Sequence, residues 1–244
     1  MKASGLRPRQ VGKASFRSLT GLFLAQGCAV CDRPTLHPFC LDCQRQILPS
    51  SVGLSPELAR RHPSTDGVML PVMSLGIYDG PLKRAILKLK YGDRPDLARP
   101  FGAALAQQWL AQQAFASKPD RQSMRSLYAL PIPLHPSRYQ ERGYNQAELV
   151  ARAFCQVSGL PLLPQGIVRI QETLPMHLLS LQARQQNLTQ AFQIGPSLQR
   201  AARSSVLLID DIYTTGTTVQ SAADTLTQAG FTVRGILVVA KATF

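Results

Sequence analysis

The segment Val206–Thr218, VLLIDDIYTTGTT, joins an apolar run to two adjacent acids and a threonine-rich loop. The apolar run predicts a buried strand, and a helix is expected to begin near Thr218. Free N–H groups at a helix N-terminus suit a phosphate, and glycine lets the backbone approach it closely. Asp210 and Asp211 can accept hydrogen bonds from sugar hydroxyls and can help to hold Mg²⁺, which prefers oxygen ligands. The segment therefore predicts a site for a phosphorylated sugar. Its expected phosphate cradle is Thr214, Thr215, Gly216, Thr217 and Thr218.

A simpler interpretation of this segment is structural. Asp211 would cap a turn, and the threonines would be strand or cap residues. That interpretation accounts for one acid but not for two acids followed by four threonines. The loop also lacks the lysine that follows the second glycine of a Walker A motif. We therefore favour the sugar-phosphate interpretation.

Four cysteines form two CxxC pairs in CAVCDRPTLHPFCLDC, at Cys28, Cys31, Cys40 and Cys43. Paired thiolates supply the tetrahedral sulfur shell that Zn²⁺ prefers, so a structural zinc knob is expected over residues 28–48. A redox CxxC is an alternative, and disulfides are disfavoured because nothing marks the chain as secreted. His37 could replace one cysteine. Cys155 lies on an apolar helical stretch and is expected in the core.

Two further segments carry basic residues at positions that could meet an anion. PIPLHPSRYQERGYNQ places Arg138 and Arg142 after a predicted strand, where the planar guanidinium group suits phosphate oxygens. In PLKRAILKLK, Arg84 and Lys88 lie four residues apart on one helix face, and an anion could offset their repulsion. Solvated surface charge is the competing explanation for both segments.

The order of predicted elements indicates an α/β protein with a parallel sheet. Strands are expected at 67–78, 127–131, 167–170, 206–209 and 233–240, and helices at 81–90, 97–115, 145–157 and 218–229. We expect a basic N-terminal extension with a short helix (1–27), the cysteine knob (28–48), a Pro- and Ser-rich linker (49–66) and one domain (67–244). That domain would comprise a hood of helix and strand (67–126) and an α/β core (127–244).

The chain has 27 Lys and Arg residues against 14 Asp and Glu, a net charge of +13. This surplus favours polyanionic partners, although a general solubility bias would have the same effect. The first thirty-one residues hold five basic residues and no acid, which imitates a transit peptide; we favour a basic tail leading into a helix at 15–25. No apolar run approaches the roughly 18 residues of a membrane span, so a soluble, cytoplasmic protein is expected.

The motif at 206–218 resembles the phosphoribosyl pyrophosphate (PRPP) signature of type I phosphoribosyltransferases. YDGPLKRAILKLKYGD, PIPLHPSRYQERGYNQAE and RQQNLTQAF follow one another in the order seen in the competence-protein ComF family. This resemblance covers nearly the whole chain from Cys28 to Lys241. It implies a type I phosphoribosyltransferase-like core with a four-cysteine knob and a site that binds PRPP together with Mg²⁺. The sequence motifs do not single out a catalytic base.

The resemblance also implies roles for individual residues. Arg138 and Arg142 would lie in the pyrophosphate-binding loop, and Lys90, Tyr91 and Arg184 would lie on the same side of the substrate. A mobile loop in the segment 171–192 would close over the reacting centre. The chain reads His177 where the family usually has Gln, which weakens any role at that position.

Three functions remain open from the sequence. The chain could transfer ribose 5-phosphate from PRPP to an unidentified acceptor, or it could handle single-stranded DNA in competence, alone or with competence or replication proteins. It could also be a PRPP sensor that regulates a partner. A single Trp and 7% aromatic residues argue against a dense base-stacking surface. Neither the acceptor nor the oligomeric state follows from the sequence.

Overall fold

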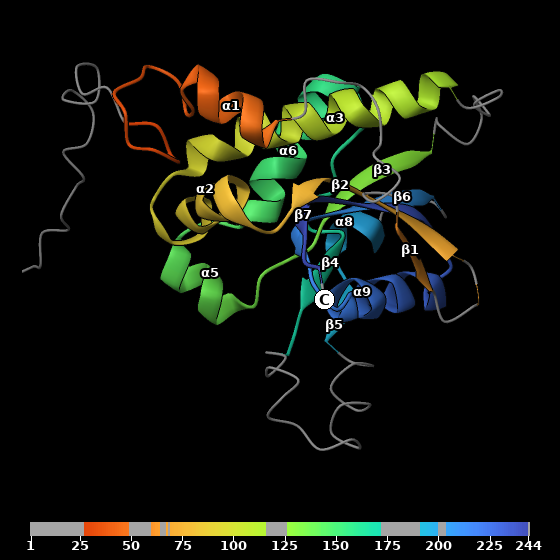
Figure 1. The fold of residues 1–244 in the computed structure, drawn as a ribbon. Coiled ribbons are helices and arrows are strands. Elements are labelled where there is room, and N and C mark those ends of the chain that lie inside the picture. Colours follow the sequence, from red (N-terminus) through yellow and green to blue (C-terminus); the bar gives the residue numbers. More distant parts are fainter. Residues whose placement is uncertain are drawn as a thin grey trace, which may run out of the picture.

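The computed structural model describes residues 27–48, 60–63, 67, 69–115, 126–171, 191–199 and 204–243. Five strands form the central sheet in the order β1-β2-β7-β6-β3 (Figure 1). Its members are β1 (Arg60–Pro63), β2 (Met69–Ile77), β7 (Thr232–Lys241), β6 (Ser205–Tyr213) and β3 (Leu127–Pro131). β2, β7, β6 and β3 run parallel to one another, and only β1 is antiparallel to its neighbour. The predicted α/β class with a mostly parallel sheet is therefore confirmed.

Helices cover both faces of this sheet. α2 (Gly80–Tyr91), α3 (Ala98–Phe115) and α6 (Gln146–Ser158) lie on one face, and α9 (Thr217–Gln228) lies on the other (Figure 1). The shorter elements are α1 (Leu41–Ile47), η2 (Pro95–Leu97), α5 (Pro136–Arg142), α8 (Pro196–Gln199) and a two-stranded sheet of β4 (Ile167–Arg169) and β5 (Phe192–Ile194). The strand expected at 167–170 thus forms, but outside the central sheet.

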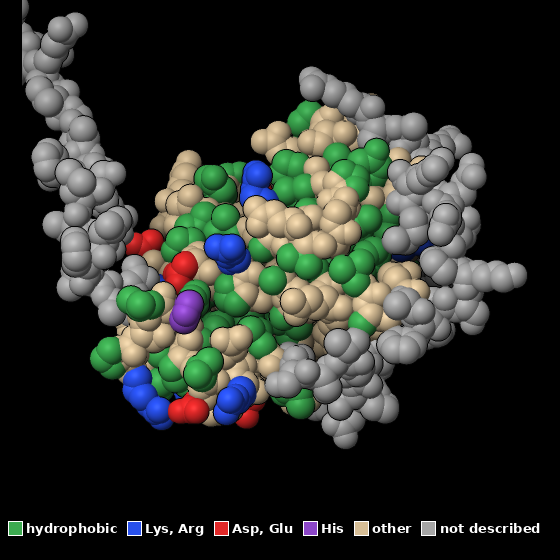
Figure 2. Space-filling model, turned by 90° about the horizontal axis from the view of Figure 1, so that it is seen from above, with side chains coloured by type: hydrophobic (Ala, Val, Ile, Leu, Met, Phe, Trp, Pro, Cys, Tyr) green, Lys and Arg blue, Asp and Glu red, His purple; other side chains and the backbone are tan. Residues whose placement is uncertain are grey.

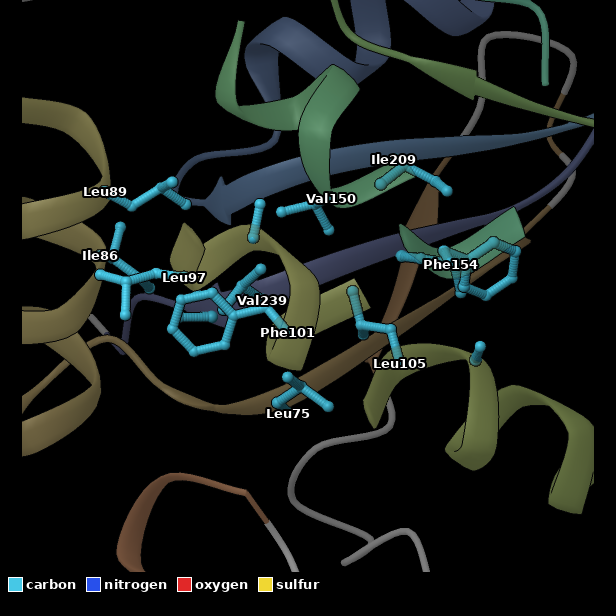
Figure 3. Packing of buried hydrophobic residues seen from close by; sticks show 14 of the residues in the cluster. Leu75, Ile86, Leu89, Leu97, Phe101, Leu105, Val150, Phe154, Ile209 and Val239 are labelled. Carbon is cyan, nitrogen blue, oxygen red and sulfur yellow. The ribbon is translucent and has the colours of Figure 1, made fainter. Parts of the chain in front are cut away.

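Strand periodicity explains the two cores. Along β6, Leu207 and Ile209 face the α2, α3 and α6 side, whereas Val206 and Leu208 face the α9 side. The first core also contains Leu89, Phe101 and Phe154 (Figure 3). In α2 the apolar residues Leu82, Ile86 and Leu89, spaced three or four apart, form the buried face of the helix. The alternation of apolar residues therefore fixes which helix covers which face.

Two elements cross the predicted domain boundaries. β1 falls in the expected linker, and β2 from the expected hood pairs with β7 of the expected core. The described part of the hood and the core thus share one sheet, while the boundaries themselves stay a prediction. The helix expected at 15–25 lies outside the described residues. Among the described residues, no helix combines the length and apolar character needed to cross a membrane.

Candidate functional site

The two acids lie near the carboxyl end of β6. The sequence predicts a strand that stops before them; the structure instead continues β6 through Tyr213, because β7 extends far enough to pair with it. Asp210 lies opposite Val238 and is half-buried, whereas Asp211 is 3% exposed. The carboxyl ends of parallel strands are where open α/β sheets bind ligands.

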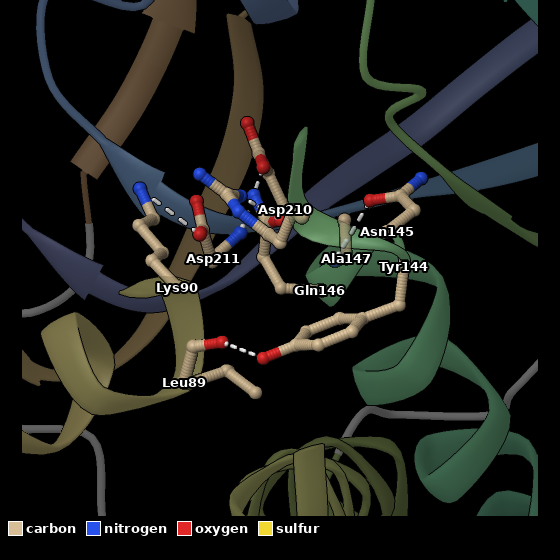
Figure 4. A network of polar contacts seen from close by, with 9 residues as sticks. Leu89, Lys90, Tyr144, Asn145, Gln146, Ala147, Asp210 and Asp211 are labelled. Carbon is tan, nitrogen blue, oxygen red and sulfur yellow. Dashed lines mark hydrogen bonds and ion pairs between the residues drawn. The ribbon is translucent and has the colours of Figure 1, made fainter. Parts of the chain in front are cut away.

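Asp210 and Asp211 differ in their surroundings (Figure 4). Burial, and then the neighbouring Asp211 carboxylate, raise the pKa of Asp210 to about 8. Asp210 Oδ1 also accepts the backbone N–H of Asp211 at 2.8 Å, which moderates this rise. A carboxyl group with such a pKa holds its proton at neutral pH. In the absence of a ligand, Asp210 is therefore a proton-bearing carboxyl group beside a second acid.

Lys90 is the cation at this pair of acids. It lies in the last turn of α2, and its Nζ is 3.0 Å from Asp211 Oδ2. The side chains are 17% and 5% exposed, so the pair is shielded from solvent. Asp211 Oδ2 is buried and accepts no hydrogen bond of good geometry among the described residues, so the ion pair with Lys90 balances its charge. The structure thus brings the predicted Lys90 to the predicted Asp211.

The threonine-rich loop runs from the end of β6 into α9. Gly216 is the N-cap of α9 with φ +81°, and no side chain caps the helix by a hydrogen bond. Thr214 and Thr215 are exposed, and Thr215 Oγ1 lies 2.9 Å from Thr217 Oγ1. The first turn of α9 contains no acid. This helix start can therefore present N–H groups and hydroxyls to an anion.

The structure separates the two predicted arginines: Arg142 lines a cavity with Lys90, and Arg138 lies outside it. Both residues lie on α5, a short helix that follows β3. Arg142 shares a cavity of about 350 Å³ with Lys90, Tyr91, Asp93, Glu141 and Tyr144. Its guanidinium carbon lies 5.1 Å from the centre of the Tyr91 ring, and it also contacts Gln146. Arg138 is exposed and does not line this cavity.

Other predictions about this region have separate outcomes. Arg184 and His177 lie outside the described residues. The helix expected at 145–157 forms as α6, which Asn145 caps by accepting the Ala147 N–H at 3.0 Å, and Gly143 before it adopts φ +80°. Tyr144 Oη donates to the Leu89 carbonyl at 2.5 Å, which ties the start of α6 to the end of α2. This contact holds two walls of the cavity together.

The sequence analysis missed His62. It comes from β1, in a segment of charged and proline residues without strand periodicity. Its ring is 4% exposed and contacts Tyr213 and Gln220, which flank the threonine-rich loop. No motif marked it, because only the pairing of β1 with β2 brings it to the loop.

The four cysteines gather into one cluster that can hold a metal ion. Their Sγ atoms all lie within 4.8 Å of one another, and Cys31 Sγ is 3.6 Å from Cys40 Sγ. Zn–S bonds of about 2.3 Å in a tetrahedron place sulfur atoms about 3.8 Å apart, so the arrangement fits such an ion. Burial would raise the pKa of the Cys28 thiol, but hydrogen bonds from the N–H groups of neighbouring residues lower it to about 6. His37 is exposed and is not part of this cluster.

The cysteine knob packs directly on α2 and α3. Cys28, Phe39 and Cys43 belong to the core on that face, and the ring of Phe39 lies 5.8 Å from that of Phe101. Lys88, which the sequence analysis left between surface charge and anion contact, pairs with Asp32 of the knob at 2.6 Å. The knob is therefore part of the structure that carries Lys90. Cys155, as expected, packs at the edge of this core.

Mg²⁺ fits the two acids poorly in this arrangement. The ammonium group of Lys90 lies at the Asp211 oxygen that a cation would use, and the pKa of Asp210 favours its protonated form. A hard divalent ion needs several ionised or neutral oxygen ligands. Any Mg²⁺ would have to come with the phosphates of a substrate.

These features define an α/β protein with a mostly parallel sheet, two acids and a threonine-rich loop at the carboxyl end of β6, and a four-cysteine cluster. No family model matches the chain. It is 28% identical to competence protein F of Haemophilus influenzae over 78% of this chain and 85% of that protein. It is 28% identical to DNA utilization protein YhgH of Salmonella typhi over 65% of this chain and 66% of that protein. It is 24% identical to competence protein ComFC of Bacillus subtilis over 92% and 81%, respectively. These relatives confirm the resemblance to the ComF family that the sequence motifs indicate.

Proposed function

We propose that the protein acts in DNA uptake or utilization and that its α/β core binds a phosphorylated sugar, of which PRPP is the best example. The relatives' names, competence protein and DNA utilization protein, support the first part. The second part depends on one observation. Two acids near the carboxyl end of β6 precede a threonine-rich loop that ends at an uncapped helix start.

In this proposal the parts of a PRPP-like ligand are bound by different residues. The loop Thr214–Thr218 would hold the 5-phosphate, and Asp210 and Asp211 would accept hydrogen bonds from the ribose hydroxyls. The pyrophosphate would meet Lys90 and Arg142 in their shared cavity, with Arg138 and Arg184 as further candidates. The ammonium group of Lys90 would then contact phosphate oxygens and would interact less strongly with Asp211. The core would correspond to the type I phosphoribosyltransferase fold.

Titration calorimetry with PRPP, with and without Mg²⁺, tests this site. The double variant Asp210→Asn, Asp211→Asn should weaken binding at least tenfold, because an amide oxygen is a weaker acceptor for the ribose hydroxyls than a carboxylate oxygen. The variant Asp42→Asn, which removes an exposed acid of the knob, should leave the affinity unchanged. Absence of PRPP binding by the unmodified protein would remove the sugar-phosphate part of the proposal.

Group transfer is a second candidate, because a bound PRPP could also react. The chain would then pass ribose 5-phosphate to an acceptor while the closed site kept water away from the anomeric carbon. Labelled PRPP incubated with a metabolite extract would yield a ribosylated product if transfer occurs. If the protein binds PRPP but forms no ribosylated product in an extract from cells that contain it, the result would favour a sensor that regulates a partner.

Single-stranded DNA is the polyanion that the relatives' names and the net charge of +13 suggest. The face that carries α1 and α3 shows basic side chains scattered among neutral ones rather than gathered into a patch (Figure 2). We propose Arg138 and Arg142, the two arginines of α5, as candidate DNA contacts. Binding of a labelled oligonucleotide should weaken steeply with salt, and Arg138→Gln should reduce the salt slope by about one.

The cysteine cluster is proposed to hold Zn²⁺ in a structural role. Four thiolates leave no open position for a substrate, and the knob's core residues pack into the main core. Metal analysis of the purified protein should find about one zinc per chain. The variant Cys31→Ser, Cys40→Ser should lose it.

A further inference from the structure

A chain of hydrogen bonds runs from β1 to α9 beneath the threonine-rich loop. His62 Nδ1 lies 2.7 Å from Tyr213 Oη, and His62 Nε2 lies 2.6 Å from Gln220 Oε1. Gln220 Nε2 in turn donates to Asp224 Oδ1 at 2.7 Å. Three elements, β1, β6 and α9, are therefore joined through one imidazole ring.

The partners fix the direction of each bond. The Asp224 carboxylate accepts from the Gln220 amide, which orients Gln220 Oε1 toward His62. His62 Nε2 must then carry the proton and donate, and the neutral ring accepts at Nδ1 from the Tyr213 hydroxyl. Burial lowers the pKa of His62 against the opposing effects of Gln220 and Asp224, which agrees with a neutral ring. Every polar atom of the imidazole is thus satisfied.

The backbone of the loop lies directly on this pair of side chains. Gly216 is buried with φ +81°, in the left-handed region that favours glycine. A Cβ atom built at Gly216 would lie 2.5 Å from Tyr213 Oη and 2.7 Å from the His62 ring. Glycine is therefore required twice, by backbone conformation and by the close approach of His62 and Tyr213.

We propose that His62 is a positioning residue that fixes both flanks of the loop Thr214–Thr218. Tyr213 immediately precedes this loop, and Gln220 lies in the first turn of the helix that follows it. By bonding to both, His62 holds the left-handed turn at Gly216 before any ligand arrives. A loop held in its binding conformation loses less conformational entropy when it binds an anion. The benefit to binding depends on the proposed sugar-phosphate function, whereas the ordering of the loop does not.

If His62 only filled space in the core, its hydrogen bonds would not matter for the conformation of the loop. An apolar side chain of similar size would then replace it with a loss of stability but without a specific effect on the loop. Glutamine, which has both a donor and an acceptor, could restore the chain only if the hydrogen bonds are what matters. The two substitutions therefore separate positioning from packing.

Hydrogen exchange in the free protein, measured by mass spectrometry on peptides that cover 213–220, is the direct test. We expect His62→Leu and Tyr213→Phe to accelerate exchange there about tenfold, and His62→Gln to stay within about threefold of the unmodified protein. Val72→Ala is the control, because it removes part of a buried residue on the same face of the sheet without touching this chain of bonds. It should lower the melting temperature without a selective effect on this segment.

The proposal is overturned if hydrogen exchange in 213–220 is unchanged in both His62→Leu and Tyr213→Phe. It is also overturned if His62→Gln exchanges as fast as His62→Leu, or if Val72→Ala accelerates exchange in this segment to the same extent. Should His62→Leu not fold, Tyr213→Phe decides alone, since it removes one hydroxyl. PRPP binding is measured separately on the same variants, and His62→Leu should weaken it about tenfold. If the unmodified protein protects the loop amides from exchange but does not bind PRPP, the sugar-phosphate function is disproved and the role of His62 in ordering the loop stands.

Discussion

Asp210 and Asp211 share one strand end, yet their different surroundings give them different tasks. Asp211 has the ammonium group of the partly buried Lys90 at 3.0 Å, whereas burial and Asp211 itself hold the pKa of Asp210 at about 8. A ligand that brings hydroxyl donors or a cation to Asp210 would favour its ionised form. Placing Asp210 beside Asp211 therefore lowers the stability of the folded protein, and a ligand that contacts Asp210 can offset this loss.

The first prediction concerns this cost. Asp210→Asn should raise the free energy of unfolding at pH 8 by about 2 kcal/mol, because an amide can be buried without ionising. The raised pKa means that the folded protein keeps a proton which the unfolded chain loses near pH 3.8. Stability therefore falls as pH rises from about 4 to 8, and the advantage of the variant should grow over the same range. Urea unfolding at several pH values measures it; an advantage that is constant with pH would contradict the assignment.

The second prediction concerns the pair of Lys90 and Asp211. Lys90→Met should cost about 3 kcal/mol or more, since it leaves a buried carboxylate without its cation. Adding Asp211→Asn to Lys90→Met should recover most of that loss, because no unpaired charge then remains. A double-mutant cycle by urea unfolding gives the coupling energy of the pair. A coupling near zero would show that the two groups do not interact in solution.

At the scale of elements, the short strand β1 contributes to the site through a single residue, His62. It has four residues at the edge of the sheet, and in the part of the chain that the structure describes it pairs with β2. Through His62 it nonetheless reaches both ends of the threonine-rich loop. Loss of β1 should therefore disturb the loop more than the core.

The third prediction follows from the lowered pKa of His62. Below about pH 6.5 the unfolded chain binds a proton at this residue that the folded protein does not take up. The contribution of His62 to stability is thus complete above that pH and decreases as pH falls. His62→Gln should flatten this part of the pH profile of the melting temperature. A profile that is the same in both proteins would mean that His62 does not titrate in this way.

The elements that the sequence predicts well are those whose pattern is local. The strand at 127–131 is found at Leu127–Pro131, and the helix expected at 145–157 is found at Gln146–Ser158, where Asn145 is the N-cap. The acids and threonines stand out for the same reason, since they adjoin one another along the chain. Periodicity and capping are properties of a few consecutive residues.

The features that sequence analysis missed depend on distant pairing. RRHP shows no strand pattern and becomes β1 only because β2 offers an edge. β6 runs past the expected end because β7 is long enough to pair with Ile212 and Tyr213. The contact of Lys90 with Asp211 requires α2 to pack on the sheet in one register. None of these is encoded within a window of neighbouring residues.

At the scale of the whole molecule, the cysteine knob and the acid pair are connected through α2. Cys28, Phe39 and Cys43 share the core of the α2 and α3 face, and Asp32 pairs with Lys88 two residues before Lys90. Arg94, just after α2, donates to the Gly27 carbonyl at 3.0 Å. The knob thus supports the end of α2 from which Lys90 reaches Asp211.

The last prediction is therefore that metal removal affects both stability and ligand binding. Thiolate ligands without their metal repel one another or take up protons, so a strong chelator should lower the melting temperature by about 5–10 °C or more. Because the end of α2 loses its support, affinity for PRPP should fall about tenfold in protein that is still folded at 25 °C. Asp42→Asn is the matched control: it removes an exposed ion pair within the knob, between Arg33 and Asp42, worth well under about 1 kcal/mol, and keeps the metal. Chelation that lowers the melting temperature but leaves PRPP affinity unchanged would separate the knob from the site and limit it to a role in folding.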